Sequence, residues 1–303
     1  MSLNFSEIYP WSDIKEVTVD GQKMVRIPKF YLHTGVLPET SKYAGKVARF
    51  ISGRKKPGFH IHPAFVKNNK ELPYFDFASY EAYNVGDGKP GSAAGKSPWV
   101  SITFQNAITA CTTRNTGTGE QAGWHLANFY EHGAIALLLL IELGHPDAQA
   151  AIGNGNVSGG GAAATGSTDA VYRGIHEFWG NIDEWRDGLK TGDARQIQIF
   201  KNTMDGTYVD TGVVVPASTR TPIQSVSIAK GEGYDLGDVF IPTAIGEGSF
   251  GKDGLWSNPN AACDVSGCWA DSAFVGPFLL GVHYPATSSN WVFGFRLART
   301  PEA

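Results

Sequence analysis

The run 173–188 combines four acidic side chains with two tryptophans in an order that does not fit a regular helix; the acids are Glu177, Asp183, Glu184 and Asp187. Gly180-Asn181 tolerates positive φ, so the backbone can turn sharply there and aim carbonyl groups inward. Carboxylate and carbonyl oxygens are ligands of hard cations. Two interpretations stay open. The corner binds a cation, or Glu184 instead accepts backbone hydrogen bonds or pairs with an arginine such as Arg173 or Arg186.

Two of the three cysteines, Cys263 and Cys268, are separated by four residues. Their thiolates would suit a soft metal. A disulfide would form if the loop between them bends, and unpaired thiols fit the spacing equally well. Cys111 follows the apolar spacing of a predicted helix and is expected in the core. Three cysteines are too few for a disulfide framework in a chain of 303 residues.

Histidines offer a weaker candidate. His60 and His62 alternate with apolar residues ahead of Pro63, so both imidazoles share one face of a short predicted strand. The sequence indicates no third metal ligand near them. His125 and His132 stand seven apart, again without a partner. We therefore expect surface or core histidines at all four positions.

The elements that position these residues are short. Alternating runs around Asp20-Gly21 and around 204–206 predict two hairpins. Helical spacing covers 101–113 and 127–143, the second ending at Gly144 and apolar on nearly every face. The glycine-rich stretch 153–168 is expected to be a loop. The pattern predicts a single α+β domain over 1–303, with 1–65 as an N-terminal β-ribbon region.

Composition excludes several classes of partner. A net charge of −4 and the lack of a basic stripe argue against nucleic acid. The apolar run 134–141 is far shorter than the roughly 20 residues that span a bilayer, so no membrane insertion is expected.

Polar residues at Asn4, Ser6 and Glu7 interrupt any early apolar stretch, so we expect synthesis in the cytoplasm without a signal peptide.

Three segments resemble one protein family. The segment 123–132 resembles a helix start of the formylglycine-generating, sulfatase-modifying proteins. Gly180-Asn181-Ile182-Asp183-Glu184-Trp185 is similar to their glycine-asparagine-x-x-glutamate-tryptophan signature, and 294–298 matches their terminal glycine-phenylalanine-arginine strand. Looser patterns resemble phage and prophage tail-fibre proteins and extend over most of the chain; they lie at 9–14, 26–31, 97–102 and 172–175. The resemblance implies an α+β, C-type lectin-like fold of antiparallel strands, few helices and long loops.

The resemblance also carries over two possible chemistries. At the corner, the family's calcium ligands correspond to the side chains of Glu177 and Glu184 and the carbonyls of Gly180 and Ile182. No cofactor is otherwise required. The family's enzymes use two cysteines with four residues between them to hold copper and activate oxygen, which makes Cys263 and Cys268 the alternative catalytic pair. The residues around this pair are Asp, Val, Ser and Gly, unlike the basic and aromatic surroundings in the enzymes.

The same fold carries ligand recognition in phage receptor-binding proteins and in the variable proteins of diversity-generating retroelements. It implies a ligand-facing loop region at 245–298, where aromatic and polar residues are the candidate ligand-binding set: Trp256, Trp269, His283, Tyr284, Ser288, Asn290 and Trp291. We expect a non-catalytic phage or prophage protein in the virion tail. Its partners would be a host surface receptor, which is a protein or a glycan, and other virion proteins. By analogy with phage fibres, we also expect it to form a homotrimer. The alternatives are a sulfatase-modifying oxidase and a purely structural virion component.

Overall fold

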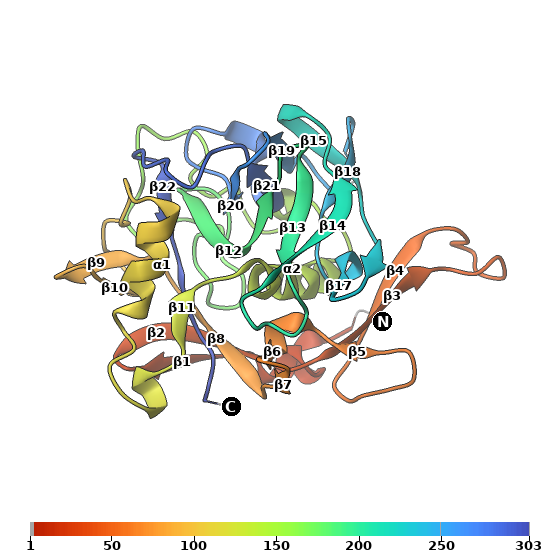
Figure 1. Cartoon of the computed structure of the whole chain (residues 1–303), viewed down its shortest axis with the longest axis horizontal. Coiled ribbons are helices and arrows are strands. Elements are labelled where there is room, and N and C mark those ends of the chain that lie inside the picture. Colours follow the sequence, from red (N-terminus) through yellow and green to blue (C-terminus); the bar gives the residue numbers. More distant parts are fainter. Residues whose placement is uncertain (1–2, 249, 303) are drawn as a thin grey trace.

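The computed structural model describes residues 3–248 and 250–302. Two large sheets enclose a buried helix, and smaller ribbons and loops surround them (Figure 1). The 3-10 turns are η1 (Phe5–Glu7), η2 (Trp11–Asp13), η3 (Pro63–Phe65), η4 (Gly119–Gln121), η5 (Leu236–Asp238) and η6 (Ser272–Phe274). Among the described residues, no helix has the length and apolar character needed to cross a membrane.

The first sheet joins the two ends of the chain. Its order is β1 (Lys15–Val19), β2 (Gln22–Pro28), β8 (Tyr74–Ala78), β23 (Leu297–Arg299) and β11 (Trp124–Leu126). Asp20 and Gly21 both adopt positive φ, 45° and 72°, as the predicted two-residue hairpin requires. Because β23 pairs with β8, the last strand of the chain lies one strand away from the opening hairpin.

The second sheet carries most of the C-terminal half. Its order is β14 (Tyr208–Val214), β13 (Gln196–Phe200), β12 (Asp183–Thr191), β20 (Ala262–Ser266), β21 (Gly276–Val282), β19 (Gly254–Ser257), β15 (Ser218–Val226) and β18 (Pro242–Ile245), with β22 (Phe293–Phe295) paired to β12. The predicted hairpin around 204–206 joins β13 and β14. The strand β12, which continues the corner, is central and is buried along most of its length.

Three α-helices occur among the described residues: α1 (Phe104–Thr112), α2 (Phe129–Leu143) and α3 (Ala148–Ala151). Asn128 and Glu131 form a capping box at the start of α2, and Gly144 ends it in the left-handed conformation. Residues of α2 share one core with residues of both large sheets. The predicted burial of this helix between layers is therefore confirmed, and Cys111 on α1 is buried as expected.

Four smaller sheets of two or three strands accompany the two large ones among the described residues. They pair β3 (Tyr31–Val36) with β4 (Val47–Ser52) and β5 (His60–Ile61), β6 (Val66–Lys67) with β7 (Lys70–Glu71), β9 (Tyr83–Gly86) with β10 (Lys89–Gly91), and β16 (Lys230–Gly231) with β17 (Tyr234–Asp235). The stretch 153–168 is irregular, as predicted. The expected α+β architecture of mainly antiparallel strands, few helices and long loops is confirmed.

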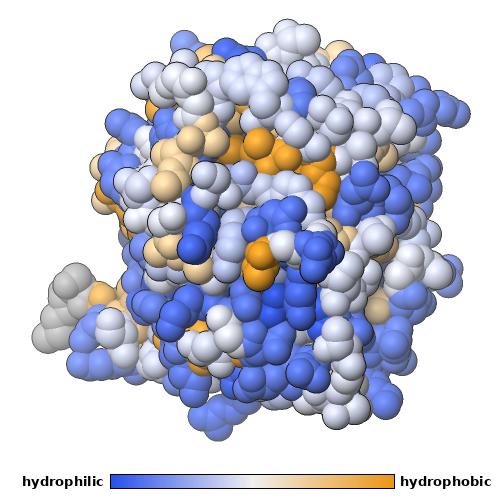
Figure 2. All heavy atoms as spheres, turned by 90° about the vertical axis from the view of Figure 1, so that its left-hand side faces the viewer, coloured by the Kyte–Doolittle hydropathy of each residue, from blue (hydrophilic) through white to orange (hydrophobic). Residues whose placement is uncertain are grey.

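Figure 2 shows the side of the molecule that carries α1, β9 and β10. Hydrophilic residues predominate on it, and hydrophobic ones form a short band in its upper half. A broad apolar patch would mark a protein or membrane contact. The visible face therefore has no broad apolar patch. Small ligands bind in concave sites, so we turn to the cavities.

Candidate ligand-binding site

A cavity of about 250 Å³ lies where side chains of β12, β15, β19, β20 and β21 meet the loops 267–272 and 283–292. Five of the seven residues that the sequence analysis selects as ligand-binding line this cavity: Trp256, His283, Tyr284, Asn290 and Trp291. The sheet thus supplies a rigid floor, while the loops supply most of the walls. Loops on a rigid scaffold are common carriers of binding residues.

Trp291 lines the cavity, and its ring packs against that of Trp269. The ring centroids of Trp269 and Trp291 are 4.7 Å apart, with the planes inclined by 39°. Trp291 is 59% exposed, so much of its indole surface faces solvent. The Trp269 amide donates to the Asn181 carbonyl at 3.1 Å, which ties this loop to the corner. A supported, exposed indole offers a large contact area at a small cost in conformational entropy.

A second aromatic group lines the cavity around His283. The His283 and Tyr284 rings have centroids 4.0 Å apart, and Trp256 lies 6.2 Å from the imidazole. Burial lowers the pKa of His283 to about 4, so the imidazole is neutral at neutral pH. Its Nδ1 is buried and has no hydrogen-bond partner among the described residues.

Aspartates form the polar side of the cavity. Burial raises the pKa of both Asp183 and Asp264, and the neighbouring carboxylates raise it further. Asp271 pairs with Arg220 at 2.8 Å. One oxygen of Asp264 is buried without a partner, and a Cβ at Gly281 would lie only 1.9 Å from the other. Glycine at 281 is therefore required for the Asp264 carboxyl group to lie against β21.

The acids and one thiol form a compact cluster. Ligand atoms of Asp183, Cys268 and Asp271 all lie within 4.8 Å of one another. Burial, with the two carboxylates, raises the pKa of Cys268, so its thiol is protonated at neutral pH. In this state the cluster presents hydrogen-bonding groups, and a cation would have to displace the thiol proton.

Ser288 and Trp269 do not line the cavity directly. The Ser288 amide donates to the Pro285 carbonyl at 2.9 Å, which closes the turn ahead of Asn290. The Asn290 carboxamide oxygen accepts from the Val292 amide at 3.0 Å, so this side chain also shapes its own loop. These residues act on the walls of the cavity through the loop conformation.

The two corner carboxylates that the resemblance implies as calcium ligands contact other groups of the protein. Glu184 is fully buried and pairs with Arg296 at 2.7 Å and with Arg186. Glu177 accepts the Gly166 amide at 2.9 Å and the Thr168 hydroxyl at 3.2 Å. Both carboxylates proposed for calcium are thus engaged by protein groups, in agreement with the arginine-pairing interpretation of Glu184.

One of the two carbonyls that the resemblance implies as calcium ligands is engaged within the turn. The Gly180 carbonyl accepts the Ile182 amide at 3.0 Å, and Asn181 adopts φ 72°. The Asn181 carboxamide donates to Glu81 at 2.6 Å and accepts from Ala163 at 2.7 Å. The corner therefore fixes the entry to β12 and, through Asn181, the position of the Trp269 loop.

The two cysteines are free and buried, so the disulfide alternative is wrong. Burial raises the pKa of the Cys263 thiol, and Asp264 raises it further. Cys268 belongs to the acidic cluster of the cavity, whereas Cys263 does not. Neither sulfur is a thiolate at neutral pH, the form that binds a soft metal or attacks a substrate. The arrangement gives no support to the oxidase alternative.

Sequence reasoning missed the polar side of the cavity. Asp264 reaches it because β12 pairs with β20, with Trp185 opposite Asp264 in the register. Asp271 and Arg220 meet across 51 positions of the chain. Asp271 follows Cys268 by three residues, but nothing in the local sequence indicates that its carboxylate lies near Asp183. The convergence is a product of strand pairing and not of residue spacing.

No family model matches the chain, and no curated protein matches it. Among solved structures, it is similar to "Structure of PvdO from Pseudomonas aeruginosa", with 11% identity, a TM-score of 0.46 and coverage of 94% of this chain and 98% of that one. It is also similar to the Treponema denticola variable protein 1, with 14% identity, a TM-score of 0.43 and coverage of 95% and 99%. The Major Tropism Determinant I1 variant shows 12% identity, a TM-score of 0.34 and coverage of 95% and 81%.

Proposed function

We propose that the protein is a non-catalytic receptor-binding protein of a phage or prophage, and that it recognises a host surface ligand in the cavity around Trp291. The observation that carries the proposal is the convergence of Trp256, His283, Tyr284 and Trp291 on a cavity whose opposite side is acidic. No described group in this cavity is an activated nucleophile. The cavity is thus suited to binding without turnover.

The chemistry of the walls favours a hydroxyl-rich ligand such as a surface glycan. Aromatic faces pack against the apolar C–H face of a sugar ring, and an exposed indole such as that of Trp291 is open to it. The buried Asp264 oxygen and the His283 nitrogen have no partner among the described residues, so sugar hydroxyls would satisfy them. A protein receptor would instead need a wider apolar contact area.

Binding to bacterial cells tests the proposal. The purified protein is titrated against a panel of bacterial strains and their isolated surface glycans. Trp291→Ala is expected to weaken binding by about 2 kcal/mol, roughly 30-fold, because an aromatic anchor is lost. Tyr43→Ala is the matched control, since Tyr43 is 57% exposed and does not line the cavity. Its affinity should stay unchanged.

Two outcomes contradict the proposal. One is the absence of saturable binding to any strain or glycan in a broad panel. The other is equal affinity of wild type and Trp291→Ala for a ligand that does bind. A protein that assembles into virions without binding any host would instead support the purely structural alternative.

The assembly state is part of the same proposal. Receptor-binding tail proteins act as several copies on one particle, and we propose a homotrimer attached to other virion proteins in the tail. Light scattering coupled to size-exclusion chromatography measures the mass directly. A mass near three times 32.6 kDa supports the trimer, and a monomer at all concentrations contradicts it.

A further inference from the structure

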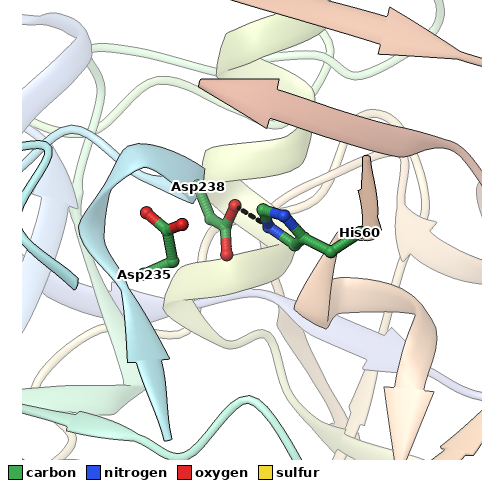
Figure 3. A group of neighbouring side chains, drawn as sticks. All are labelled: His60, Asp235 and Asp238. Carbon is green, nitrogen blue, oxygen red and sulfur yellow. Dashed lines mark hydrogen bonds and ion pairs between the residues drawn. The ribbon is translucent and has the colours of Figure 1, made fainter. Parts of the chain in front are cut away.

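A second cluster of chemically active side chains lies away from the cavity around Trp291. It consists of His60 on β5, Asp235 at the end of β17 and Asp238 in η5 (Figure 3). One ligand atom from each residue lies within 4.8 Å of the other two. His60 and Asp238 are 178 positions apart in the chain. The fold alone therefore brings this set together.

The backbone around the cluster is held from both sides. β5 pairs with β3, with His60 opposite Leu32. The η5 turn is fixed at Gly237, whose carbonyl accepts the Thr34 hydroxyl at 3.1 Å and the Arg49 guanidinium at 3.0 Å. The same β3–β4 ribbon thus positions both halves of the cluster. A site of fixed geometry needs little reorganisation to bind a ligand.

Asp238, at the centre of the cluster, has one carboxylate oxygen without a hydrogen-bond partner among the described residues. Its side chain is only 1% exposed. One carboxylate oxygen lies 2.6 Å from His60 Nε2, whereas the other is buried and has no hydrogen-bond partner among the described residues. Figure 3 shows the Asp238 carboxylate between the His60 imidazole and Asp235. A buried, unpaired carboxylate oxygen is costly, and a cation placed there would satisfy it.

The cluster borders an open space. A cavity of about 520 Å³ is lined by His60, Asp235, Lys230, Tyr234, Asn69 and Asn202. Asp238 does not itself line this cavity, whereas its two partners in the cluster do. An ion bound by the three side chains would therefore have protein on one side and the cavity on the other. Water or a small anionic group could complete its coordination from the cavity.

We propose that His60, Asp235 and Asp238 bind a divalent cation of the zinc class, with an open coordination position toward this cavity. The donor set is one imidazole nitrogen and two carboxylates, which suits zinc. With metal–ligand distances near 2.1 Å, the edge of a tetrahedron is about 3.4 Å. The 2.6 Å contact between His60 and Asp238 would have to lengthen to reach this value, and the three ligand atoms already lie within 4.8 Å of one another.

Calcium fits the cluster less well. It takes 6–8 oxygen ligands in proteins, whereas this set offers two carboxylates and a nitrogen. The charges also balance for a divalent ion, because two carboxylates face it. The nearby cations are Arg49, which is engaged by the carbonyls of Gly237 and Val239, and Lys230 on the cavity wall. The bound ion would join β5 to the segment between β15 and β18.

Zinc binding to the full-length, chelator-treated protein tests the proposal by calorimetric titration with ZnCl₂. We expect one ion per chain and a higher melting temperature in its presence. His60→Gln and Asp235→Asn should each weaken binding by at least about 100-fold, since even loss of an outer-shell group costs 10–100-fold. Asn at 235 retains an oxygen that can accept from the Gly237 amide, as Asp235 does at 2.9 Å, so the turn should be kept.

His145→Gln is the matched control, because His145 is exposed and lies outside the cluster. Asp271→Asn removes a carboxylate from the cluster that includes Cys268, which distinguishes the two candidate sites. Three results overturn the proposal. They are the absence of zinc binding, equal binding by wild type and His60→Gln when both are folded, and loss of binding in Asp271→Asn alone. Host binding by these variants is a separate readout, so failure here leaves the receptor proposal untouched.

Discussion

At the scale of single residues, Glu184 lies at the centre of a buried ion-pair network. Burial alone would raise the pKa of Glu184, but the guanidinium groups of Arg296 and Arg186 hold it well below its usual range. Arg296 also donates to carbonyl groups of Ala78 and Glu177, at 3.1 and 3.0 Å. One carboxylate thus links the corner, β8 and the terminal strand. Glu184 and the arginine of the final glycine-phenylalanine-arginine segment therefore belong to one buried ion-pair network.

Glu184→Gln should destabilise the protein strongly. It leaves two buried guanidinium groups without their counter-charge, and breaking a buried pair costs about 3–5 kcal/mol. Urea unfolding followed by circular dichroism measures the difference. The control is Glu71→Gln, which removes a surface pair with Lys29 and should change the free energy of unfolding by at most about 1 kcal/mol. Equal effects of the two substitutions would contradict this account.

At the scale of elements, the sequence predicts what depends on local signals. The hairpin at Asp20-Gly21, the helix that ends at Gly144 and the irregular stretch 153–168 all follow from turn chemistry and apolar spacing. The sites do not, because they depend on pairing between distant segments. Asp264 reaches the ligand cavity through the β12–β20 register, and His60 meets its acids across 178 positions.

Gly144→Ala tests the C-terminal cap of α2. Nothing lies within 4 Å of a Cβ at this position, so the only cost is the positive φ of 73°. We expect a loss of about 1 kcal/mol in the free energy of unfolding. Gly160→Ala is the matched control, since its Cβ also meets open space but its φ is not positive. That substitution should be neutral or slightly stabilising, and a loss equal to that of Gly144→Ala would contradict the assignment.

At the scale of the whole molecule, the core holds histidines in the neutral state. Burial, together with the nearby Arg186, lowers the pKa of His132 on α2 to about 3. Its Nε2 lies 2.8 Å from the Pro277 carbonyl, to which the neutral ring donates. An unfolded histidine binds its proton near pH 6.5. Between about pH 6.5 and pH 3 the unfolded chain therefore holds one proton more at this residue, and the folded state loses stability as the pH falls.

The contribution of His132 is measurable by comparison with His132→Gln, which retains a donor but does not titrate. Between pH 6 and pH 4, the stability of wild type should fall relative to the variant by about 1.4 kcal/mol per pH unit. Urea unfolding at a series of pH values gives the difference. Parallel pH profiles of the two proteins would show that His132 is already protonated in the core.

The two sheets and α2 share one core, and the loops after β20 and β21 add walls of the proposed ligand cavity. The corner connects these parts, because Asn181 accepts the Trp269 amide while Glu184 holds the terminal strand. We propose that the host ligand binds in the cavity bounded by Trp256, His283 and Trp291.

A crystal structure of the protein soaked with the glycan that the cell panel identifies tests this claim most directly. We expect a sugar ring against the exposed face of Trp291, with hydroxyl groups directed at Asp264 and His283. Bound glycan at another surface, with this cavity holding only water, would contradict it.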